Sequence, residues 1–316
     1  MSELPQNDND SFRVVRASEI ESEPVSRNWL IEDLWTASAV GWVAGQPKSL
    51  KSWTALEMAV SVSSGTPCLG RYRVEERGKA LVYLAEDSLP AVRERLEALG
   101  HQRRLSIEAL DVHVITAPSV RLDLSRDQLR LEKTVRSLAP RLLVLDPLIR
   151  LHRADENSSG EISGLLAYLR QLERELRLAV VVVHHVRKAA LPSGAAGQAL
   201  RGSSDLHAWS DSAWYLKRRG DEVVVTIEHR SAPTPSPLRL RLVNEDGRPQ
   251  LRLLEGAKED EESSQSLEAR ILGALEESAP LSRAALRERL SVRNERLGRA
   301  IERLEEARSI ERAAEG

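Results

Sequence analysis

The sequence has little cysteine, little net charge and no long apolar run among its 316 residues. Cys68 is the only cysteine, which excludes an intrachain disulfide framework and a zinc site of several cysteines, and is typical of a reducing cytoplasm. Lys and Arg total 46 and Asp and Glu total 48, so no global basic field attracts nucleic acid, and such binding requires a local patch. The chain has no stretch of about 18 apolar residues and no signal peptide, so we expect a cytoplasmic protein with no membrane partner.

The composition and length predict a globular protein with two unequal parts. Hydrophobic residues make up 41% of the chain and charged residues 30%, as in globular proteins generally. Polar residues 1–27 predict a flexible N-terminal segment, and an acidic, serine-rich stretch at 256–265 predicts a linker. We therefore expect a large domain over 28–255 and a small module over 266–316.

Short apolar runs alternate with longer amphipathic segments in the first two-thirds of the chain. Strands are expected at 40–44, 80–85, 112–115, 142–145 and 180–183, and helices at 53–64 and 89–99. Glycine and proline then separate apolar segments that predict antiparallel hairpins at one sheet edge: Leu216, 223–227, 238–243 and 251–254. The expected fold is α/β with a parallel central sheet and antiparallel edge hairpins.

The segment GQPKSLKS at 45–52 follows an expected strand and precedes an apolar-periodic helix, as a phosphate-binding loop does. Its spacing from Gly45 to Lys51 and Ser52 matches that motif, in which the lysine reaches the β- and γ-phosphates of ATP and the hydroxyl ligates Mg²⁺. Lys48 either contacts phosphate or adds positive charge nearby. Leu50 occupies the position of the last glycine, so the course of the backbone there stays open. The alternative is a surface turn with two lysines.

Carboxylates follow two other expected strands, at the edge where a parallel sheet carries its chemistry. Asp146 follows the strand at 142–145 and is a candidate to hold Mg²⁺ through water, or else begins an Asp-Pro turn. Glu86 follows the strand at 80–85 and is the candidate base that orients the attacking water. The adjacent Asp87 is able to exchange roles with Glu86, unless the pair only caps the next helix.

Histidine and arginine candidates follow the valine-rich strand at 180–183. His185 is a candidate sensor of the γ-phosphate, although a histidine at a strand end is more often structural. A glycine- and alanine-rich stretch at 193–199 predicts a mobile loop that leads to Arg201. Arg201 is either a solvated side chain or a finger that reaches the nucleotide of a neighbouring subunit.

The ordered series GQPKSLKS, YLAED, LLVLDPLIRLHRADEN, VVVVHHVRK and LRGSSDLHAWSDSAWYL resembles the RepA-like ATPases of the RecA superfamily. These are AAA-type P-loop NTPases whose founding example is a plasmid replicative helicase. The resemblance covers about residues 28–230. It implies a RecA-like core that assembles as a ring, commonly a hexamer, with ATP and Mg²⁺ between subunits and single-stranded DNA in the channel.

The same resemblance implies a role for each matching residue. It gives the phosphate loop to Gly45, Lys51 and Ser52, the metal-linked acid to Asp146, the catalytic base to Glu86, the phosphate sensor to His185 and the finger in trans to Arg201. Segments 150–164 and 188–201 fall where such proteins line the channel. Their candidate DNA contacts are Arg150, His152, Arg153 and Lys188.

The C-terminal module is not a part that we associate with the plasmid helicase. Three amphipathic segments at 267–277, 283–290 and 294–307 predict a helix-turn-helix unit of winged-helix type. Arg296, Arg299 and Arg303 lie on one face of its last helix and are candidate DNA contacts. A helical packing or self-association element is the alternative, since nearby glutamates offset these arginines. Its ligand is expected to be duplex DNA or a replication or recombination protein.

The leading hypothesis from sequence is an ATP-hydrolysing, DNA-associated ring ATPase, a helicase or translocase acting on single-stranded DNA of a plasmid, phage or mobile element. The alternative is an ATP-dependent DNA-binding regulator or loader that does not unwind DNA. A small-molecule kinase is less favoured, because Glu86 and an arginine-bearing loop suit hydrolysis better than guarded phosphoryl transfer.

Overall fold

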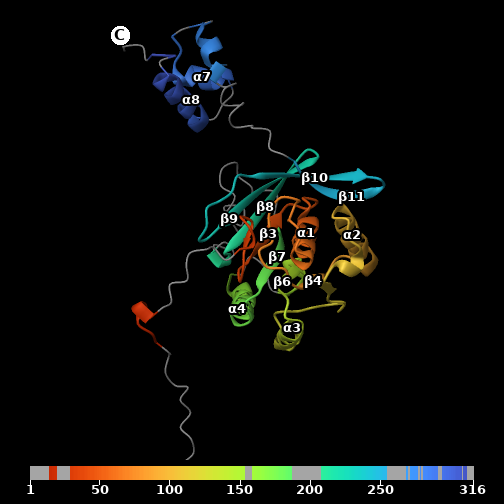
Figure 1. The fold of residues 1–316 in the computed structure, drawn as a ribbon. Coiled ribbons are helices and arrows are strands. Elements are labelled where there is room, and N and C mark those ends of the chain that lie inside the picture. The colour runs from red at the N-terminus through yellow and green to blue at the C-terminus, as the bar shows by residue number, and fades with distance from the viewer. Residues whose placement is uncertain are drawn as a thin grey trace, which may run out of the picture. The chain divides into compact units, whose positions relative to one another are not determined.

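A computed structural model describes residues 14–19, 29–153, 159–186 and 208–254, and within 268–311 all but 270, 277, 279, 291–293 and 308. The chain divides into two compact units, Met1–Leu254 and Glu255–Gly316 (Figure 1). The linker expected at 256–265 and most of the N-terminal segment lie outside the described residues.

The first unit is built around a nine-stranded sheet with the order β11-β10-β9-β8-β3-β7-β6-β4-β5. Its parallel strands are β3 (Val40–Gly45), β4 (Ala80–Leu84), β5 (Val112–Val114), β6 (Leu142–Asp146), β7 (Ala179–His185) and β8 (Ser212–Arg219). The hairpin strands β9 (Glu222–His229), β10 (Leu238–Glu245) and β11 (Arg248–Leu254) continue it antiparallel. A separate small sheet pairs β1 (Trp29–Ile31) with β2 (Trp35–Thr36). The predicted α/β fold with antiparallel edge hairpins is confirmed.

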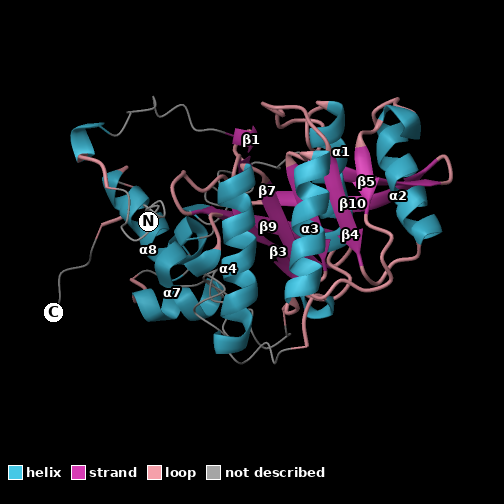
Figure 2. Ribbon diagram, turned by 90° about the horizontal axis from the view of Figure 1, so that it is seen from below, coloured by secondary structure: helices cyan, strands magenta, loops and turns pink. Residues whose placement is uncertain are grey.

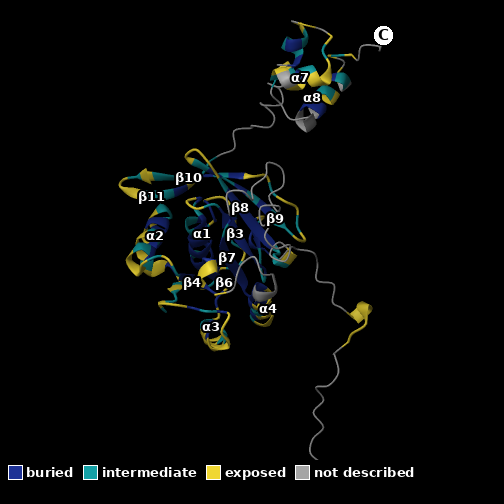
Figure 3. Cartoon of the chain, turned by 180° about the vertical axis from the view of Figure 1, so that it is seen from behind, coloured by how far each residue is buried: buried dark blue, intermediate teal, exposed yellow. Residues whose placement is uncertain are grey.

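Helices cover both faces of this sheet. The helices α1 (Lys51–Ser64) and α2 (Leu89–Gln102) lie on one face, and α3 (Ser125–Leu138) and α4 (Ser159–Leu176) on the other, where Figure 2 shows them in front of the strands. The described residues also include the short 3₁₀ turns η1 (Ala17–Glu19), η2 (Ile107–Ala109) and η3 (Leu148–Arg150). Because the inner parallel strands β3, β4, β6 and β7 are covered on both faces, nearly all of their side chains are buried, as the dark blue strands of Figure 3 show.

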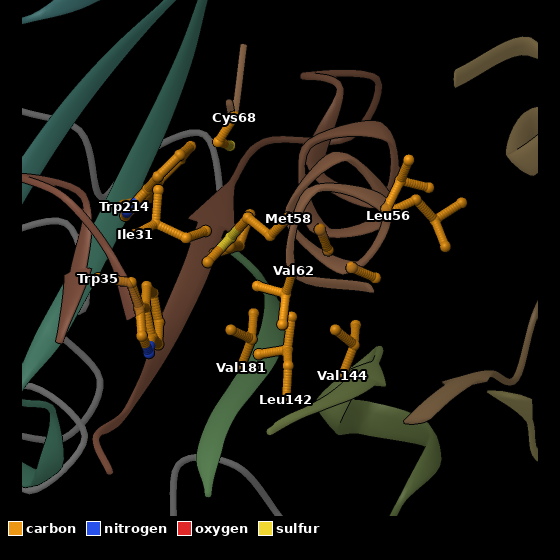
Figure 4. Packing of buried hydrophobic residues seen from close by; sticks show 14 of the residues in the cluster. Ile31, Trp35, Leu56, Met58, Val62, Cys68, Leu142, Val144, Val181 and Trp214 are labelled. Carbon is orange, nitrogen blue, oxygen red and sulfur yellow. The ribbon is translucent and has the colours of Figure 1, made fainter. Parts of the chain in front are cut away.

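The helix α1 is enclosed by the protein along most of its length. Val62 points toward the sheet residues Leu142 and Val181, and Met58 extends toward β3 on the side of Ile31 (Figure 4). Eleven of its fourteen residues are buried, polar ones such as Glu57 and Ser61 among them, so protein surrounds the helix on nearly all sides. Each large apolar side chain buried here stabilises the fold by about 1.5–3 kcal/mol. The N-terminal end of α1 is therefore held in a fixed position against the sheet.

A buried ion pair joins α1 to α2. The Arg103 guanidinium contacts the carboxylate of Glu57 and donates hydrogen bonds to the hydroxyls of Ser61 and Thr66, both at 2.9 Å. The same Glu57 carboxylate accepts a hydrogen bond from the backbone N–H of Leu69 at 2.6 Å. Burial beside this pair raises the pKa of the Cys68 thiol, which favours the protonated, unreactive form. Cys68 is therefore a structural residue of this core.

The second unit is helical. It contains α7 (Arg283–Leu290) and α8 (Asn294–Glu306), and residues 271–276 are helical as well. Their shared core consists of Ile271, Ala274, Leu286, Leu297, Ala300 and Leu304. The predicted amphipathic segments thus pack around one small core, and the winged-helix assignment stays a prediction. Among the described residues of the chain, no helix is both long enough and apolar enough to cross a membrane.

Candidate functional site

The loop at 45–52 runs from the end of β3 to the start of α1, and local sterics shape it. A Cβ on Gly45 would lie 2.5 Å from the carbonyl oxygen of Leu216 and 2.7 Å from Oγ of Ser49, so only glycine fits. Leu50 has φ +64° and ψ +19°, the left-handed backbone that glycine adopts without strain. Its side chain packs against the core beside α1, which offsets a cost of about 1–2 kcal/mol. The question left open by the sequence is answered: the backbone at Leu50 takes the turn that a glycine would take.

Lys51 begins α1 and is held inside the loop. Its Nζ donates a hydrogen bond to the carbonyl oxygen of Gln46 at 2.7 Å, and Oγ of Ser49 donates to the same oxygen at 2.7 Å. Burial lowers the pKa of Lys51 to about 8, and the charges of Asp146 and Glu86 oppose that shift. The ammonium therefore lies at the loop, next to two carboxylates, where an incoming phosphate would meet positive charge.

Asp146 ends β6 and is buried beside the N-terminus of α1. Burial raises its pKa to about 6, while a hydrogen bond from Ser52 and the charge of Lys51 lower it. No donor among the described residues contacts its Oδ2. A hydroxyl and a carboxylate with spare acceptor capacity are the oxygen ligands that Mg²⁺ takes alongside water and phosphate. Ser52 and Asp146 therefore fit a magnesium ion bound with a nucleotide.

Glu86 and Asp87 follow β4 and have different partners. Oε1 of Glu86 accepts a hydrogen bond from Nε of Arg150 at 2.8 Å. Both carboxylate oxygens of Asp87 accept hydrogen bonds from Arg95, at 2.7 and 2.9 Å. The next helix is capped by Ser88, whose hydroxyl accepts from the N–H of Ala91. The helix α2 is therefore capped by Ser88, and neither Glu86 nor Asp87 is its N-cap residue.

His185 and His184 point to opposite faces of β7, because consecutive strand residues alternate. His185 is the register partner of Gly45 in the parallel pair of β7 and β3, so it reaches the loop. Burial and the Lys51 charge lower its pKa. His184 is buried with its ring centroid 5.8 Å from that of Trp42, and burial lowers its pKa to about 4. His184 is therefore neutral at pH 7.

The predicted residues meet at one pocket of about 340 Å³. It is lined by Lys48, Ser49, Leu50, Lys51, Ser52, Trp53, Glu86, Asp87, Arg95, Asp146, His185 and Arg218. Gly45 lies at the base of the loop, at the end of β3. The sequence motifs therefore converge in space as their positions at strand ends predict.

Three lining residues were not predicted from the sequence. Arg218 on β8 donates from Nη1 to the carbonyl oxygen of Lys48 at 3.1 Å. Arg95 on α2 pairs with Asp87 and lies over the ring of Trp53, 5.8 Å from its centroid. No motif marks these two arginines. The third residue is Trp53. Its position directly after the loop is the one sequence signal that could have identified it as a lining residue.

The candidate DNA contacts differ in exposure, and several of them lie outside the described residues. Arg150 and Arg153 are exposed. His152 is buried, with 4% of its surface exposed, so its side chain is less accessible than those of the two arginines, and its contact with DNA stays a prediction. Lys188 and Arg201 lie outside the described residues, as do the side chains of Arg296 and Arg299. Arg303 is exposed and lies 3.7 Å from Glu268.

Comparison with known proteins gives the same fold. A DnaB-like replicative helicase, solved in a study of its interactions with primase, superposes with a TM-score of 0.52 at 18% identity, over 70% of this chain and 59% of that one. The RadB recombinase superposes with a TM-score of 0.50 at 20% identity, over 69% of this chain and 92% of that one. This chain thus spans about three-fifths of the length of the DnaB-like helicase.

A family model described as an AAA domain matches residues 6–190, which is more than half of the chain and includes the loop, both strand-end acids and His185. The chain therefore belongs to this AAA domain family, with the fold of a RecA-like P-loop ATPase.

Proposed function

We propose that the protein is an ATP-hydrolysing, DNA-associated ring ATPase, a RepA-like helicase or translocase that acts on single-stranded DNA in replication or recombination of a plasmid, phage or other mobile element. One observation carries the proposal: Lys51, Ser52, Glu86 and Asp146, which come from three strand ends, line a single pocket. This set matches the parts that phosphoryl transfer requires, namely a cation, metal ligands and a group that positions water.

Each residue has a part in hydrolysis that follows from its place. The backbone N–H groups at the start of α1 and the Lys51 ammonium bind the phosphates of ATP. Ser52 and Asp146 would hold Mg²⁺, which would neutralise charge on the phosphates. Glu86 orients the attacking water as general base. His185, on the strand opposite Gly45, is placed to sense the terminal phosphate.

Assembly into a ring, of six subunits by the resemblance, would complete the site with Arg201 from a neighbour. The Arg201→Ala variant is expected to bind ATP and not to hydrolyse it, since an arginine finger accelerates hydrolysis by about 10³ to 10⁵. Mixing Lys51→Ala with Arg201→Ala should restore turnover, because some interfaces of mixed rings would then hold both residues intact. Full activity of Arg201→Ala alone would contradict this assignment.

The central test is ATP hydrolysis by the purified protein with and without single-stranded DNA. Lys51→Ala removes the ammonium from the loop, so it serves as the blank for contaminating activity. Strong stimulation by the single strand is expected if exposed residues such as Arg150 and Arg153 contact DNA. Hydrolysis that is indifferent to DNA would contradict the motor.

An ATP-dependent DNA-binding regulator or loader is the second candidate, and the separate helical unit over 255–316 favours it. Such a protein would use nucleotide to set its assembly and the helical unit to bind duplex DNA or a replication or recombination protein. A strand-displacement assay on a tailed duplex separates the two candidates. Directional unwinding supports the helicase, and tight binding without displacement supports the regulator.

A further inference from the structure

The candidate base Glu86 is held by an arginine from a neighbouring strand end. Nε of Arg150 lies 2.8 Å from Oε1 of Glu86. The strands β4 and β6 are parallel neighbours, with Leu84 opposite Asp146. Glu86 follows β4 and Arg150 ends η3, the turn after β6, so the sheet brings these two side chains together.

This contact occupies one of the acceptor sites of the Glu86 carboxylate, the group that hydrolysis requires as an acceptor. Glu86 lines the pocket, whereas Arg150 is not among its lining residues. A general base has to accept a hydrogen bond from the attacking water. An ionised carboxylate has only acceptor sites, and a charge-assisted bond to a guanidinium occupies one of them in a fixed direction. In the observed arrangement Arg150 therefore holds Oε1 of Glu86 from outside the set of lining residues.

Arg150 is also accessible to a competing anion. Its side chain is 59% exposed, and the neighbouring Ile149 is exposed as well. Ion pairs between exposed side chains are weak and are screened by salt. A phosphodiester offers the guanidinium two oxygens in the planar geometry that arginine prefers. A polynucleotide is thus able to replace Glu86 as the partner of Arg150.

We propose that Arg150 is a positioning residue that restrains Glu86 in the resting subunit, and that a phosphate of single-stranded DNA releases Glu86 by taking over the guanidinium. The inference rests on the proposed function and adds to it a physical route from DNA binding to hydrolysis. The route runs through one ion pair between adjacent strand ends and requires no movement of the sheet.

The chain offers a closely matched control. Arg93 pairs with Glu97 on α2 through the same atoms, Nε and Oε1, at the same 2.8 Å. The exposed fractions are 64% and 45% for that pair and 59% and 45% for Arg150 and Glu86. Arg93→Ala therefore removes an ion pair of equal geometry and exposure outside the pocket.

The experiment measures kcat and KM for ATP with and without an oligothymidylate for the wild type, Arg150→Ala, Arg150→Lys and Arg93→Ala. Arg150→Ala should raise the DNA-free kcat about fivefold, which corresponds to about 1 kcal/mol at 1.4 kcal/mol per factor of ten. Its stimulation by DNA should fall toward one, with KM for ATP unchanged. Arg150→Lys should be intermediate, because an ammonium retains the charge without the fork. Arg93→Ala should behave as the wild type.

Salt gives a second readout that does not depend on a substitution. At saturating ATP, added salt should raise the DNA-free kcat of the wild type toward that of Arg150→Ala, and should change the variant less.

A DNA-free kcat of Arg150→Ala at or below the wild-type value, or unchanged stimulation by DNA, would overturn the inference alone, provided that Lys51→Ala abolishes wild-type turnover. A wild type that neither binds nor hydrolyses ATP would overturn the proposed function, and the inference with it.

Discussion

Leu50 is the residue at which this phosphate loop departs from the usual glycine pattern. Its φ of +64° shows that the backbone requirement of the loop is met although the residue is not glycine. A non-glycine residue in this region carries strain, and the packing of the leucine side chain beside α1 compensates it. The loop thus keeps the backbone conformation of the usual glycine although the residue at this position is leucine.

Substitutions at Leu50 should separate backbone conformation from side-chain packing. Leu50→Gly should leave nucleotide affinity within about twofold, because glycine adopts the observed φ freely. Leu50→Val should weaken nucleotide binding by about tenfold, because a β-branched residue is a genuine outlier at positive φ. Titration with a fluorescent ATP analogue measures both. Equal affinity of the glycine and valine variants would contradict this account.

The charge of Lys51 should make nucleotide binding depend on pH. Burial lowers its pKa to about 8, so the ammonium is present below that pH and is lost as the pH rises through it. Affinity for ATP, measured with a chelator so that no metal is bound, should therefore fall between about pH 7.5 and 9. Lys51→Arg keeps its charge over this range and should abolish the fall. A fall of equal size in that variant would exclude Lys51 as the titrating group.

Residues of the candidate site differ in how far the sequence predicts them. Lys51, Ser52, Glu86, Asp146 and His185 all follow apolar strands, and the carboxyl ends of parallel strands share one edge of the sheet. Arg95 and Arg218 line the same pocket, yet one lies within the helix α2 and the other within β8, an interior strand of the sheet. Nothing in their local pattern distinguishes them from the solvated arginines of this charged chain. Their roles in the pocket depend on the tertiary fold.

At the scale of elements, the strand β3 positions the phosphate loop of the site. It lies between β7 and β8 and leads directly into the loop. A Cβ on Gly41 would lie 1.6 Å from the backbone carbonyl oxygen of Ser212, a group fixed by the sheet. Small residues in β3 thus permit the close pairing of β3 and β8.

Gly41→Ala should therefore lower the free energy of unfolding by about 3 kcal/mol, at the upper end of the cost of overpacking. Gly164→Ala is the matched control, because Gly164 lies in α4 with nothing within 4 Å of an added Cβ. Alanine in a helix interior is more stable than glycine by about 0.5–1 kcal/mol. Denaturant unfolding should move the two variants in opposite directions. A Gly41→Ala variant as stable as the wild type would contradict the pairing described for β3 and β8.

The sequence predicts the strands better than their directions. The valine run and the short apolar segments correspond to β7, β6 and β4, because strands covered on both faces are continuously apolar. The segment around Leu216 is predicted as part of the antiparallel edge. In the structure β8 is antiparallel to β9 and parallel to β3. The pattern of apolar residues is the same in a parallel and in an antiparallel strand. Whether β8 pairs in parallel or antiparallel fashion with a neighbour therefore depends on the tertiary fold.

At the scale of the whole molecule, the two compact units have separate cores. The pocket and every lining residue belong to the first unit. A chain that ends at Leu254 should bind nucleotide within about twofold of the full chain and should lose binding of duplex DNA, if the helical unit provides it. Calorimetry with ATP and a gel-shift assay measure these. Loss of nucleotide binding on truncation would contradict the independence of the pocket.

The valines of β7 have a consequence for how its register is set. The register of a strand against its neighbours is usually fixed by having one apolar face and one polar face. Residues 180–183 are all valine and two histidines follow, so sliding the strand by one residue would leave both faces apolar and would put His184 where His185 is. Side chains therefore specify the alignment weakly. The ends specify it instead, where Ala179 N donates to Arg141 O at 2.9 Å and Val186 N to Gly45 O at 3.1 Å. Correct assembly of this strand is decided at its termini and not along its length.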